Sequence, residues 1–282
     1  MEKYDVIIIG AGPAGLTSAL YGARANRKVL VLDGEFGLGE AGKIMHLENY
    51  PGIESVDGLS FLFALQSQAK KAGAEIVSES VTRIDCSAKT VTTKNRTYNA
   101  DNIILATGCK SQKLGLKGEK ELIGYGVSYC ATCDGTLFRG REVALVGRGR
   151  KAEDDVRYLA KIVKKVYYIT SDKNYIADNV ENLDVKVLEL VGNPLEKIIL
   201  SNQKQLYVPV IFVNIGYLPE TSLVLGQVKT DEKGYIITDE NMQTDVKGIY
   251  AVGDIRQKSL RQIVTACADG AVAVEHAIRR KK

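Results

Sequence analysis

The chain has 282 residues, of which 45% are hydrophobic and 26% charged, and its formal net charge at pH 7 is +4. This composition is that of a globular protein of about two domains, and it excludes collagen-like, disordered and disulfide-scaffold proteins. The charge is too small to predict nucleic-acid binding, and we interpret the basic run Arg279–Lys282 as solvated. Five cysteines, an odd number, predict a reducing cytoplasmic setting.

The first patterned segment, Val6–Ala23, contains no charged residue over 18 positions. That length approaches what a membrane span or a signal peptide needs. Four glycines and Pro13 argue against both, because they gather where a strand must turn sharply into a helix. Val6–Ile9 predicts a buried parallel strand, the stretch to about Asn26 a helix, and Lys28–Leu32 a second strand, which together make a βαβ unit. We expect no membrane association.

The turn of this unit, Gly10-Ala11-Gly12-Pro13-Ala14-Gly15, has the spacing of a dinucleotide-binding loop. Gly10 permits the tight turn, Gly12 lets the backbone approach a pyrophosphate, and Gly15 lets the helix pack closely on the strand. Asp33 lies 23 residues after Gly10, where a carboxylate can accept hydrogen bonds from both ribose hydroxyls. The alternative is a glycine-rich turn that holds no ligand.

The rest of the chain predicts a second unit of the same kind. After a glycine-rich loop, the sequence predicts an amphipathic helix and three or so short strands before Ala106-Thr107-Gly108. A second βαβ unit begins near Glu142, with its glycine turn at Gly147-Arg148-Gly149-Arg150-Lys151-Ala152. The predicted elements are, in chain order, a loop 34–42, a helix 58–72, strands within 75–106, a strand 143–146, a helix 152–163, a strand 166–170, strand-rich sequence 183–215, a strand 249–252 and a helix 261–280.

A pair of cysteines stands out at Cys130-Ala131-Thr132-Cys133-Asp134. Such a pair can close a small disulfide ring or supply half of a zinc site, but zinc needs four ligands and the sequence offers no second ligand pair. We therefore interpret Cys130 and Cys133 as a redox pair. Asp134 can move the proton that thiol exchange needs, or it can cap a helix. The other cysteines are interpreted as buried small hydrophobes and the two histidines as structural or surface residues; they are Cys86, Cys109, Cys267, His46 and His276.

These residues resemble the low-molecular-weight thioredoxin reductase family over nearly the whole chain. The most specific match is 126–135, which resembles the redox segment of that family. The other matches are 10–15, 48–52, 106–108, and 253–254 together with 261–263. The resemblance implies FAD as cofactor, a homodimer, and thioredoxin or a similar small protein disulfide as substrate.

The resemblance also implies an α/β fold of two nucleotide-binding, Rossmann-like, three-layer domains, the second inserted into the first. The FAD domain would comprise residues 1–112 and 247–282, and the redox-disulfide domain residues 113–246. Asp254 would bind the ribityl and pyrophosphate region, the backbone of 261–263 would lie near the isoalloxazine, and Lys43 would bring a positive charge near the flavin. The residues assigned to FAD are Gly10, Gly12, Pro13, Ala14, Gly15, Asp33, Gly42, Lys43, Asn49, Val81, Ala106, Thr107, Gly108, Gly253, Asp254, Arg261, Gln262 and Ile263.

The second unit departs from the family pattern. Members that use NADPH carry, after the strand that follows the turn, an arginine-rich run that neutralises the 2′-phosphate. Here that run is Thr170-Ser171-Asp172-Lys173-Asn174-Tyr175-Ile176, without arginine. Asp172 would repel a 2′-phosphate, and Thr170 stands where an NADH-type acid would be. Arg148, Arg150 and Lys151 crowd the turn and oppose the helix dipole, although they could also grip an anion.

Our leading hypothesis is a flavin disulfide reductase that takes electrons from reduced ferredoxin, similar to the ferredoxin-dependent flavin thioredoxin reductases. The alternative is a thioredoxin reductase that uses NADPH or NADH through an atypical site. A third hypothesis is a flavin-bound module without turnover, which would not need the Cys130–Cys133 pair or Asp134.

Overall fold

The computed structural model describes residues 3–34, 39–44, 46–172 and 175–279. Part of the predicted loop at 34–42, residues 173–174 of the arginine-free run and the basic end after Arg279 lie outside the described residues. The chain divides into two compact units. The first comprises Met1–Ile44, Tyr50–Lys110 and Leu218–Lys282, and the second comprises Met45–Asn49 and Ser111–Tyr217. No helix in the described ranges combines the length and apolar character that a bilayer span requires.

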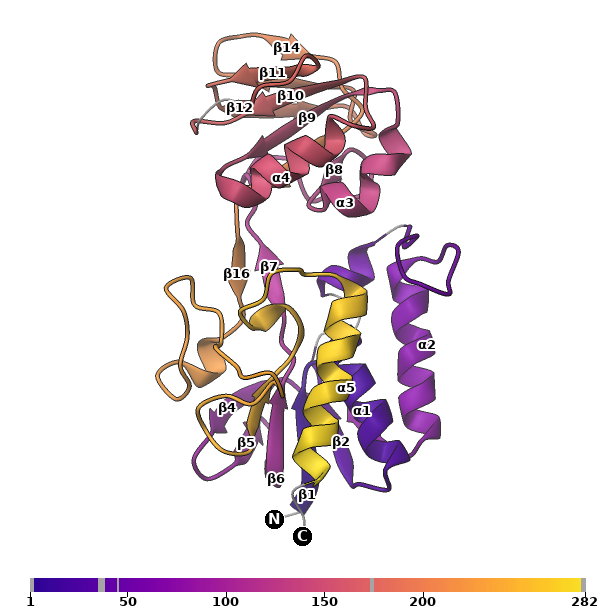
Figure 1. The fold of residues 1–282 in the computed structure, drawn as a ribbon, viewed down its shortest axis with the longest axis vertical. Coiled ribbons are helices and arrows are strands. Elements are labelled where there is room, and N and C mark those ends of the chain that lie inside the picture. Colours follow the sequence, from indigo (N-terminus) through magenta and orange to yellow (C-terminus); the bar gives the residue numbers. More distant parts are fainter. Residues whose placement is uncertain (1–2, 35–38, 45, 173–174, 280–282) are drawn as a thin grey trace. The chain divides into compact units, whose positions relative to one another are not determined.

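The first unit is built on a seven-stranded sheet ordered β3-β2-β1-β6-β5-β4, with β17 paired to β6 (Figure 1). The segment expected to hold three or so strands holds four. The parallel strands are β1 (Lys3–Ile9), β2 (Val29–Leu32), β3 (Glu75–Val77), β6 (Thr97–Leu105) and β17 (Ile249–Ala251). The antiparallel strands are β4 (Val81–Asp85) and β5 (Thr90–Thr93). One face carries the helices α1 (Pro13–Arg24), α2 (Gly58–Lys71) and α5 (Ile263–Arg279).

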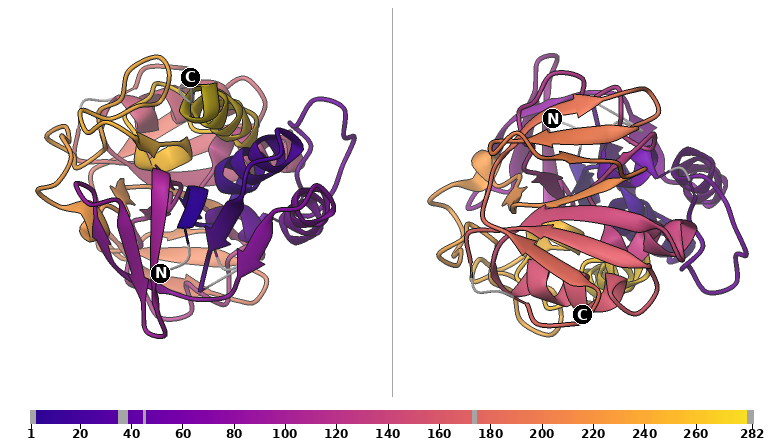
Figure 2. Two further views of the ribbon diagram at one scale, coloured as in Figure 1. Left: turned by 90° about the horizontal axis from the view of Figure 1, so that it is seen from below. Right: turned by 90° about the horizontal axis from the view of Figure 1, so that it is seen from above.

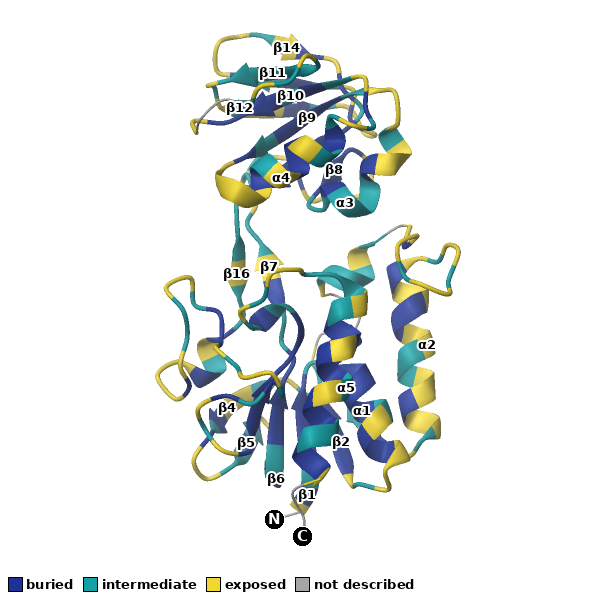
Figure 3. Ribbon diagram, in the orientation of Figure 1, coloured by how far each residue is buried: buried dark blue, intermediate teal, exposed yellow. Residues whose placement is uncertain are grey.

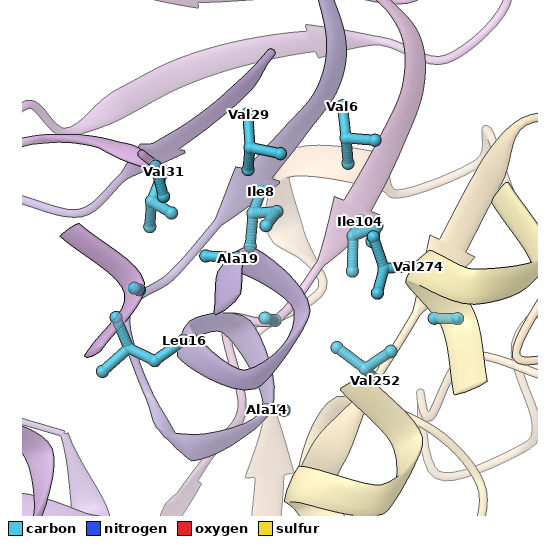
Figure 4. Packing of buried hydrophobic residues seen from close by; sticks show 14 of the residues in the cluster. Val6, Ile8, Ala14, Leu16, Ala19, Val29, Val31, Ile104, Val252 and Val274 are labelled. Atoms are coloured by element: carbon cyan, nitrogen blue, oxygen red, sulfur yellow. The ribbon is translucent and has the colours of Figure 1, made fainter. Parts of the chain in front are cut away.

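This sheet separates two hydrophobic cores, because successive side chains of a strand point to opposite faces. On β1, Val6 and Ile8 join the core beneath the helices, whereas Ile7 and Ile9 join the core on the other face. Figure 4 shows Val6 and Ile8 on the same side of the sheet as Leu16 of α1. The central strands are buried along most of their length (Figure 3), as the uncharged run of β-branched residues predicts.

The second unit is a three-layer structure around a fully parallel sheet ordered β11-β10-β9-β15-β8. Helices α3 (Ala131–Asp134) and α4 (Gly149–Leu159) pack on one face. A three-stranded antiparallel sheet packs on the other face, as Figure 2 shows. The parallel strands are β8 (Val127–Ser128), β9 (Glu142–Gly147), β10 (Lys165–Ile169), β11 (Val180–Leu183) and β15 (Ile211–Asn214). The covering strands are β12 (Val187–Val191), β13 (Lys197–Leu200) and β14 (Gln205–Leu206).

Helix α4 differs from its predicted range of 152–163. It begins at Gly149, whose φ of +73° is one that glycine adopts without strain. It ends at Leu159, four residues before the predicted end.

The unit boundary also differs from the expected one. The sequence places the return to the first domain at 247, whereas residues 218–246 already group with the first unit. The physical reason is their apolar side chains: Val224, Val228 and Ile236 are buried in the core on the face opposite the helices. The chain passes from one unit to the other at β7 (Cys109–Ser111) and β16 (Tyr217–Pro219), which pair as a two-stranded sheet.

Close packing of α1 and α5 generates a first prediction. A Cβ added at Gly270 of α5 would lie 2.2 Å from the Ala14 carbonyl oxygen of α1. Alanine normally stabilises a helix by about 1 kcal/mol relative to glycine, but a backbone atom cannot move aside. We therefore expect Gly270→Ala to lower the free energy of unfolding by about 2 kcal/mol in urea titrations. Val272→Ala, on an exposed position of the same helix, should change it by less than about 0.5 kcal/mol. Equal stability of Gly270→Ala and the unmodified chain would contradict the packing argument.

Candidate active site

The first candidate site lies where four parallel strands of the first unit end. Strands β2, β1, β6 and β17 are neighbours in the sheet, and their carboxyl ends lead to Asp33, Gly10, Ala106 and Gly253. In open α/β sheets, ligands bind in the crevice outside the carboxyl ends of the strands. The sequence positions assigned to the cofactor at 10–15, 33, 106–108 and 253–254 are therefore brought to one edge.

The glycines of the loop differ in what surrounds them. Gly10 has a φ of +105°, and a Cβ there would lie 2.5 Å from the Ala106 oxygen. A Cβ on Gly15 would lie 2.0 Å from the Gly10 oxygen. A Cβ on Gly12, by contrast, would meet no atom of the described residues within 4 Å. Gly10 and Gly15 are thus required by the fold, whereas the space beside Gly12 is open for a ligand.

Two carboxylates border this loop. Asp33 accepts a hydrogen bond from the Ala11 N–H at 2.6 Å, which fixes it next to the turn. Asp254 has one oxygen, Oδ2, within 3.9 Å of the Cys109 thiol, which donates to it, and its other oxygen, Oδ1, is buried without a partner among the described atoms. Burial raises the pKa of Asp254, although the charges of Lys258 and Arg261 lower it.

These features fit the dinucleotide that the resemblance implies. A buried oxygen without a partner is costly unless something donates to it, and a ribityl or ribose hydroxyl is such a donor. The open space beside Gly12 suits the pyrophosphate. The thiol of Cys109, which the sequence predicts only to be a buried hydrophobe, belongs to this site; burial raises its pKa to about 12, so it is kept protonated.

Among the remaining positions assigned to the cofactor are three whose side chains contact other parts of the chain. Thr107 donates to the Glu220 carbonyl at 2.8 Å, and Lys43 forms an ion pair with Glu40 at 2.7 Å. The positive charge expected from Lys43 thus has a carboxylate beside it. The guanidinium of Arg261 lies 4.0 Å from the centre of the Tyr235 ring. Gly42 lies in the short helix η1 (Glu40–Lys43), Asn49 in the segment that groups with the second unit, Val81 at the start of β4, and Gln262 just before Ile263, the first residue of α5.

The second candidate site is the cysteine pair of the second unit. Cys130 and Cys133 form a disulfide, with their Cα atoms 5.3 Å apart, and both are half-buried. They follow β8, and Cys133 lies in the four-residue helix α3. Ser128 of β8 donates to Asp134 Oδ2 at 2.6 Å and accepts from the Cys130 N–H at 3.1 Å. One hydroxyl therefore connects the acid to the backbone of the cysteine pair.

The carboxyl group of Asp134 has a raised pKa. Burial raises the pKa of its carboxyl above the ordinary value, while the Ser128 hydrogen bond and the charge of His46 lower it. Because burial is the largest of these effects, the carboxyl stays protonated to a higher pH than an exposed aspartate. Of the two histidines interpreted as structural or surface residues, His46 therefore has an electrostatic effect at this site.

A buried carboxylate stabilises the segment before the cysteines. Glu119 is 3% exposed and accepts hydrogen bonds from the N–H groups of 114, 115 and 116 and from the Tyr129 hydroxyl at 2.6 Å. The Tyr129 carbonyl in turn accepts from Tyr217 at 2.7 Å. Tyr129 directly precedes Cys130, so both ends of this residue are fixed. Sequence reasoning gave no role to either Glu119 or Ser128. Glu119 has no local signature, whereas Ser128 lies in the matched segment 126–135, which could have drawn attention to it.

The glycine turn of the second unit and the helix after it contact polar side chains of their own unit. Asp172 accepts from the Gly149 N–H at 2.5 Å. Lys151 forms an ion pair with the buried Asp155 at 2.5 Å, and Asn214, at the end of β15, donates to Asp155 at 2.6 Å. The side chains of Arg148 and Arg150 are exposed.

Comparison with known proteins places the chain in a family. Residues 4–270 match the family "Pyridine nucleotide-disulphide oxidoreductase". A thioredoxin reductase of Peptoclostridium acidaminophilum is 39% identical over 97% of this chain and 96% of its own. The crystal structure of a thioredoxin reductase from Streptococcus pyogenes covers 98% of this chain and 97% of its own, with a TM-score of 0.92 and 34% identity. A ferredoxin-flavin thioredoxin reductase from Clostridium acetobutylicum covers 99% and 98%, with a TM-score of 0.56 and 32% identity.

The open space beside Gly12 gives a second prediction. The Cβ of a valine at this position would meet no atom of the part of the chain that the structure describes, so Gly12→Val should fold normally but obstruct the pyrophosphate of FAD. We expect the purified variant to bind FAD more weakly by more than about tenfold, measured by flavin absorbance and by titration of the flavin-free protein. Gly12→Ala, with a smaller side chain, should lose less. The flavin-free forms of both variants should unfold at the same temperature as flavin-free wild type, and a Gly12→Val protein with full flavin content would contradict the site.

Proposed function

The chain belongs to the pyridine nucleotide-disulphide oxidoreductase family, binds FAD and is a thioredoxin reductase homologue, and from this premise we propose that it reduces thioredoxin with electrons from reduced ferredoxin. The observation that supports disulfide reduction is the Cys130–Cys133 disulfide next to a half-buried acid, Asp134, whose pKa is raised by desolvation. FAD, when bound, supplies a centre that accepts electrons one at a time and passes on two. The first unit would hold FAD, and the second would carry the disulfide.

The reaction needs two electrons and two protons for each disulfide. Two reduced ferredoxins supply one electron each, and the Cys130–Cys133 bond breaks to give two thiols. A thiolate of this pair then attacks the thioredoxin disulfide, forming a mixed disulfide that the other thiol resolves, so that thioredoxin leaves as a dithiol. Asp134, with its raised pKa, holds a proton that a leaving thiolate can take. Ser128 orients this carboxyl through its 2.6 Å hydrogen bond.

Ferredoxin as donor is supported by the charges of the second unit. In the part of the run 170–176 that the structure describes, no arginine is available for a 2′-phosphate, and Asp172 is an exposed carboxylate after β10. Two negative groups a few ångströms apart repel by about 1 kcal/mol or more. Thr170, which is buried, offers no carboxylate to a ribose. A ferredoxin transfers electrons through surface contact and needs no nucleotide pocket. The similarity to a ferredoxin-flavin thioredoxin reductase is consistent with this donor.

One observation favours a second candidate, an enzyme that uses NADPH or NADH. The second unit keeps a strand, a glycine turn and a helix in the order of a dinucleotide-binding unit, with Gly147, Gly149 and Ala152 at the expected spacing. Gly147 is required there, because a Cβ would lie 2.7 Å from the Asn214 oxygen. The homodimer that the resemblance implies and the cytoplasmic location that the cysteine usage predicts stay predictions.

Asp134 gives a third prediction. Asp134→Asn keeps an oxygen for the Ser128 hydroxyl but cannot release a proton, so thioredoxin reduction should fall on the order of 10²-fold. The wild-type rate should decline as pH rises through the raised pKa, and the variant should lack this decline. Burial penalises the charged form, so the fold loses stability as pH rises from the unfolded pKa to the raised folded pKa. At pH 7 the variant should therefore unfold at the same temperature or higher. An active variant with the wild-type pH profile would contradict this role.

The donor is tested by comparing reductants, which gives a fourth prediction. Reduced ferredoxin should support thioredoxin reduction at rates on the order of 10 per second. Anaerobic titration with NADPH or NADH should leave the flavin absorbance unchanged. Because ferredoxins are typically acidic and this chain carries a net charge of +4, the ferredoxin rate should fall with ionic strength as steering is screened.

The control is Cys130→Ser, which should bind FAD and accept electrons from ferredoxin but should not reduce thioredoxin. If NADPH or NADH supports turnover and reduced ferredoxin does not, the proposed donor is wrong and the enzyme is the second candidate, which uses NADPH or NADH. Thioredoxin reduction by Cys130→Ser would overturn the role of the cysteine pair.

A further inference from the structure

The chain contains two strand–turn–helix units, and they differ in which N–H group of the turn is bound by an aspartate of the same unit. In the first, Gly10 directly follows the strand β1 and Gly12 precedes the helix α1; in the second, Gly147 and Gly149 stand at the same spacing. Each unit also has an aspartate after its second strand that accepts a backbone hydrogen bond from the turn. These are Asp33 and Asp172.

The two aspartates bind different residues of the turn. Asp33 accepts from Ala11, the residue between the two glycines, and leaves the Gly12 position free. Asp172 accepts at 2.5 Å from Gly149, the counterpart of Gly12. The second glycine is the one at which the backbone approaches a pyrophosphate. A Cβ at either glycine would meet no described atom within 4 Å, so the two turns differ in the hydrogen bond and not in the space beside the glycine. The carboxylate of Asp172 therefore takes, in the second turn, the N–H of the residue at which the backbone approaches a pyrophosphate.

Three further features of the second turn agree with a carboxylate of the chain itself at this position. The left-handed conformation lies at Gly10 in the first turn, with a φ of +105°, but at Gly149 in the second, with a φ of +73°. The backbone therefore follows a different path around the second glycine. Lys151 is paired with Asp155 and is not free for a phosphate. Asp172 is itself fixed, because its own N–H donates to the Thr170 hydroxyl at 3.0 Å.

We propose that Asp172 is a specificity-determining residue that occupies, from within the chain, the phosphate position of the second turn and so excludes pyridine nucleotides from this unit. The inference rests on the proposed function, in which the donor is not a nucleotide, and it names the side chain responsible. The second unit thereby retains its strand–turn–helix structure, while the carboxylate of Asp172 excludes the phosphates of a nucleotide from its turn.

Asp172→Ala tests this inference through binding, without any electron transfer. Dissociation constants for NADP⁺ and NAD⁺ are measured by calorimetry on the FAD-loaded protein, whose first turn is filled. Wild type should bind both weakly, and Asp172→Ala should bind both at least about tenfold more tightly. Asp172→Asn, whose amide oxygen can still accept from Gly149, should gain less. Asp184→Ala removes an exposed carboxylate of the same unit and should match wild type.

Each contrary result overturns the inference. It fails if wild type binds NADP⁺ as tightly as Asp172→Ala, if Asp172→Ala gains nothing, or if Asp184→Ala gains as much. The proposed donor is tested apart from it by the ferredoxin assay on wild type. Ferredoxin turnover without a gain in Asp172→Ala refutes this inference alone. Tighter binding by Asp172→Ala without ferredoxin turnover refutes the donor alone.

Discussion

The close approach of backbones around α1 is the constraint on which the cofactor site depends. At Gly15 and Gly270 a Cβ would lie 2.0 Å and 2.2 Å from carbonyl oxygens of Gly10 and Ala14. Without these side chains, α1 can pack directly against the end of β1 and against α5. The turn between β1 and α1 is therefore fixed by packing on both sides, and its open side at Gly12 is ready for a phosphate before any ligand arrives.

Three carboxylates, the buried Glu119 and the half-buried Asp254 and Asp134, have different uses because they have different numbers of partners. Glu119 accepts from three backbone N–H groups and one hydroxyl, so its charge is fully compensated and its role is structural. Asp254 has one oxygen near the Cys109 thiol and one that finds no partner among the described residues, which suits a binding group. Asp134 has the Ser128 hydroxyl and a raised pKa, which suits a proton store.

The two βαβ units show how one architecture supports different chemistry. Both place an aspartate after the second strand, but Asp33 bonds beside the phosphate position and Asp172 bonds at it. A shift of the accepting carboxylate by one backbone N–H is a small change in structure. In an electrostatic site it decides whether an anion finds a free donor or a negative charge.

The sequence by itself determined the elements whose cause is local. The run Val6–Ile9, the spacing of Gly10, Gly12 and Gly15, and the Cys130–Cys133 pair are patterns over a few residues, and they predicted the first βαβ unit, its turn and the disulfide. Only the tertiary structure decided which distant groups meet. Cys109 lies 145 residues from Asp254, and residues 218–246 join the first unit through buried side chains. No local pattern records such contacts, because they follow from the packing of whole sheets.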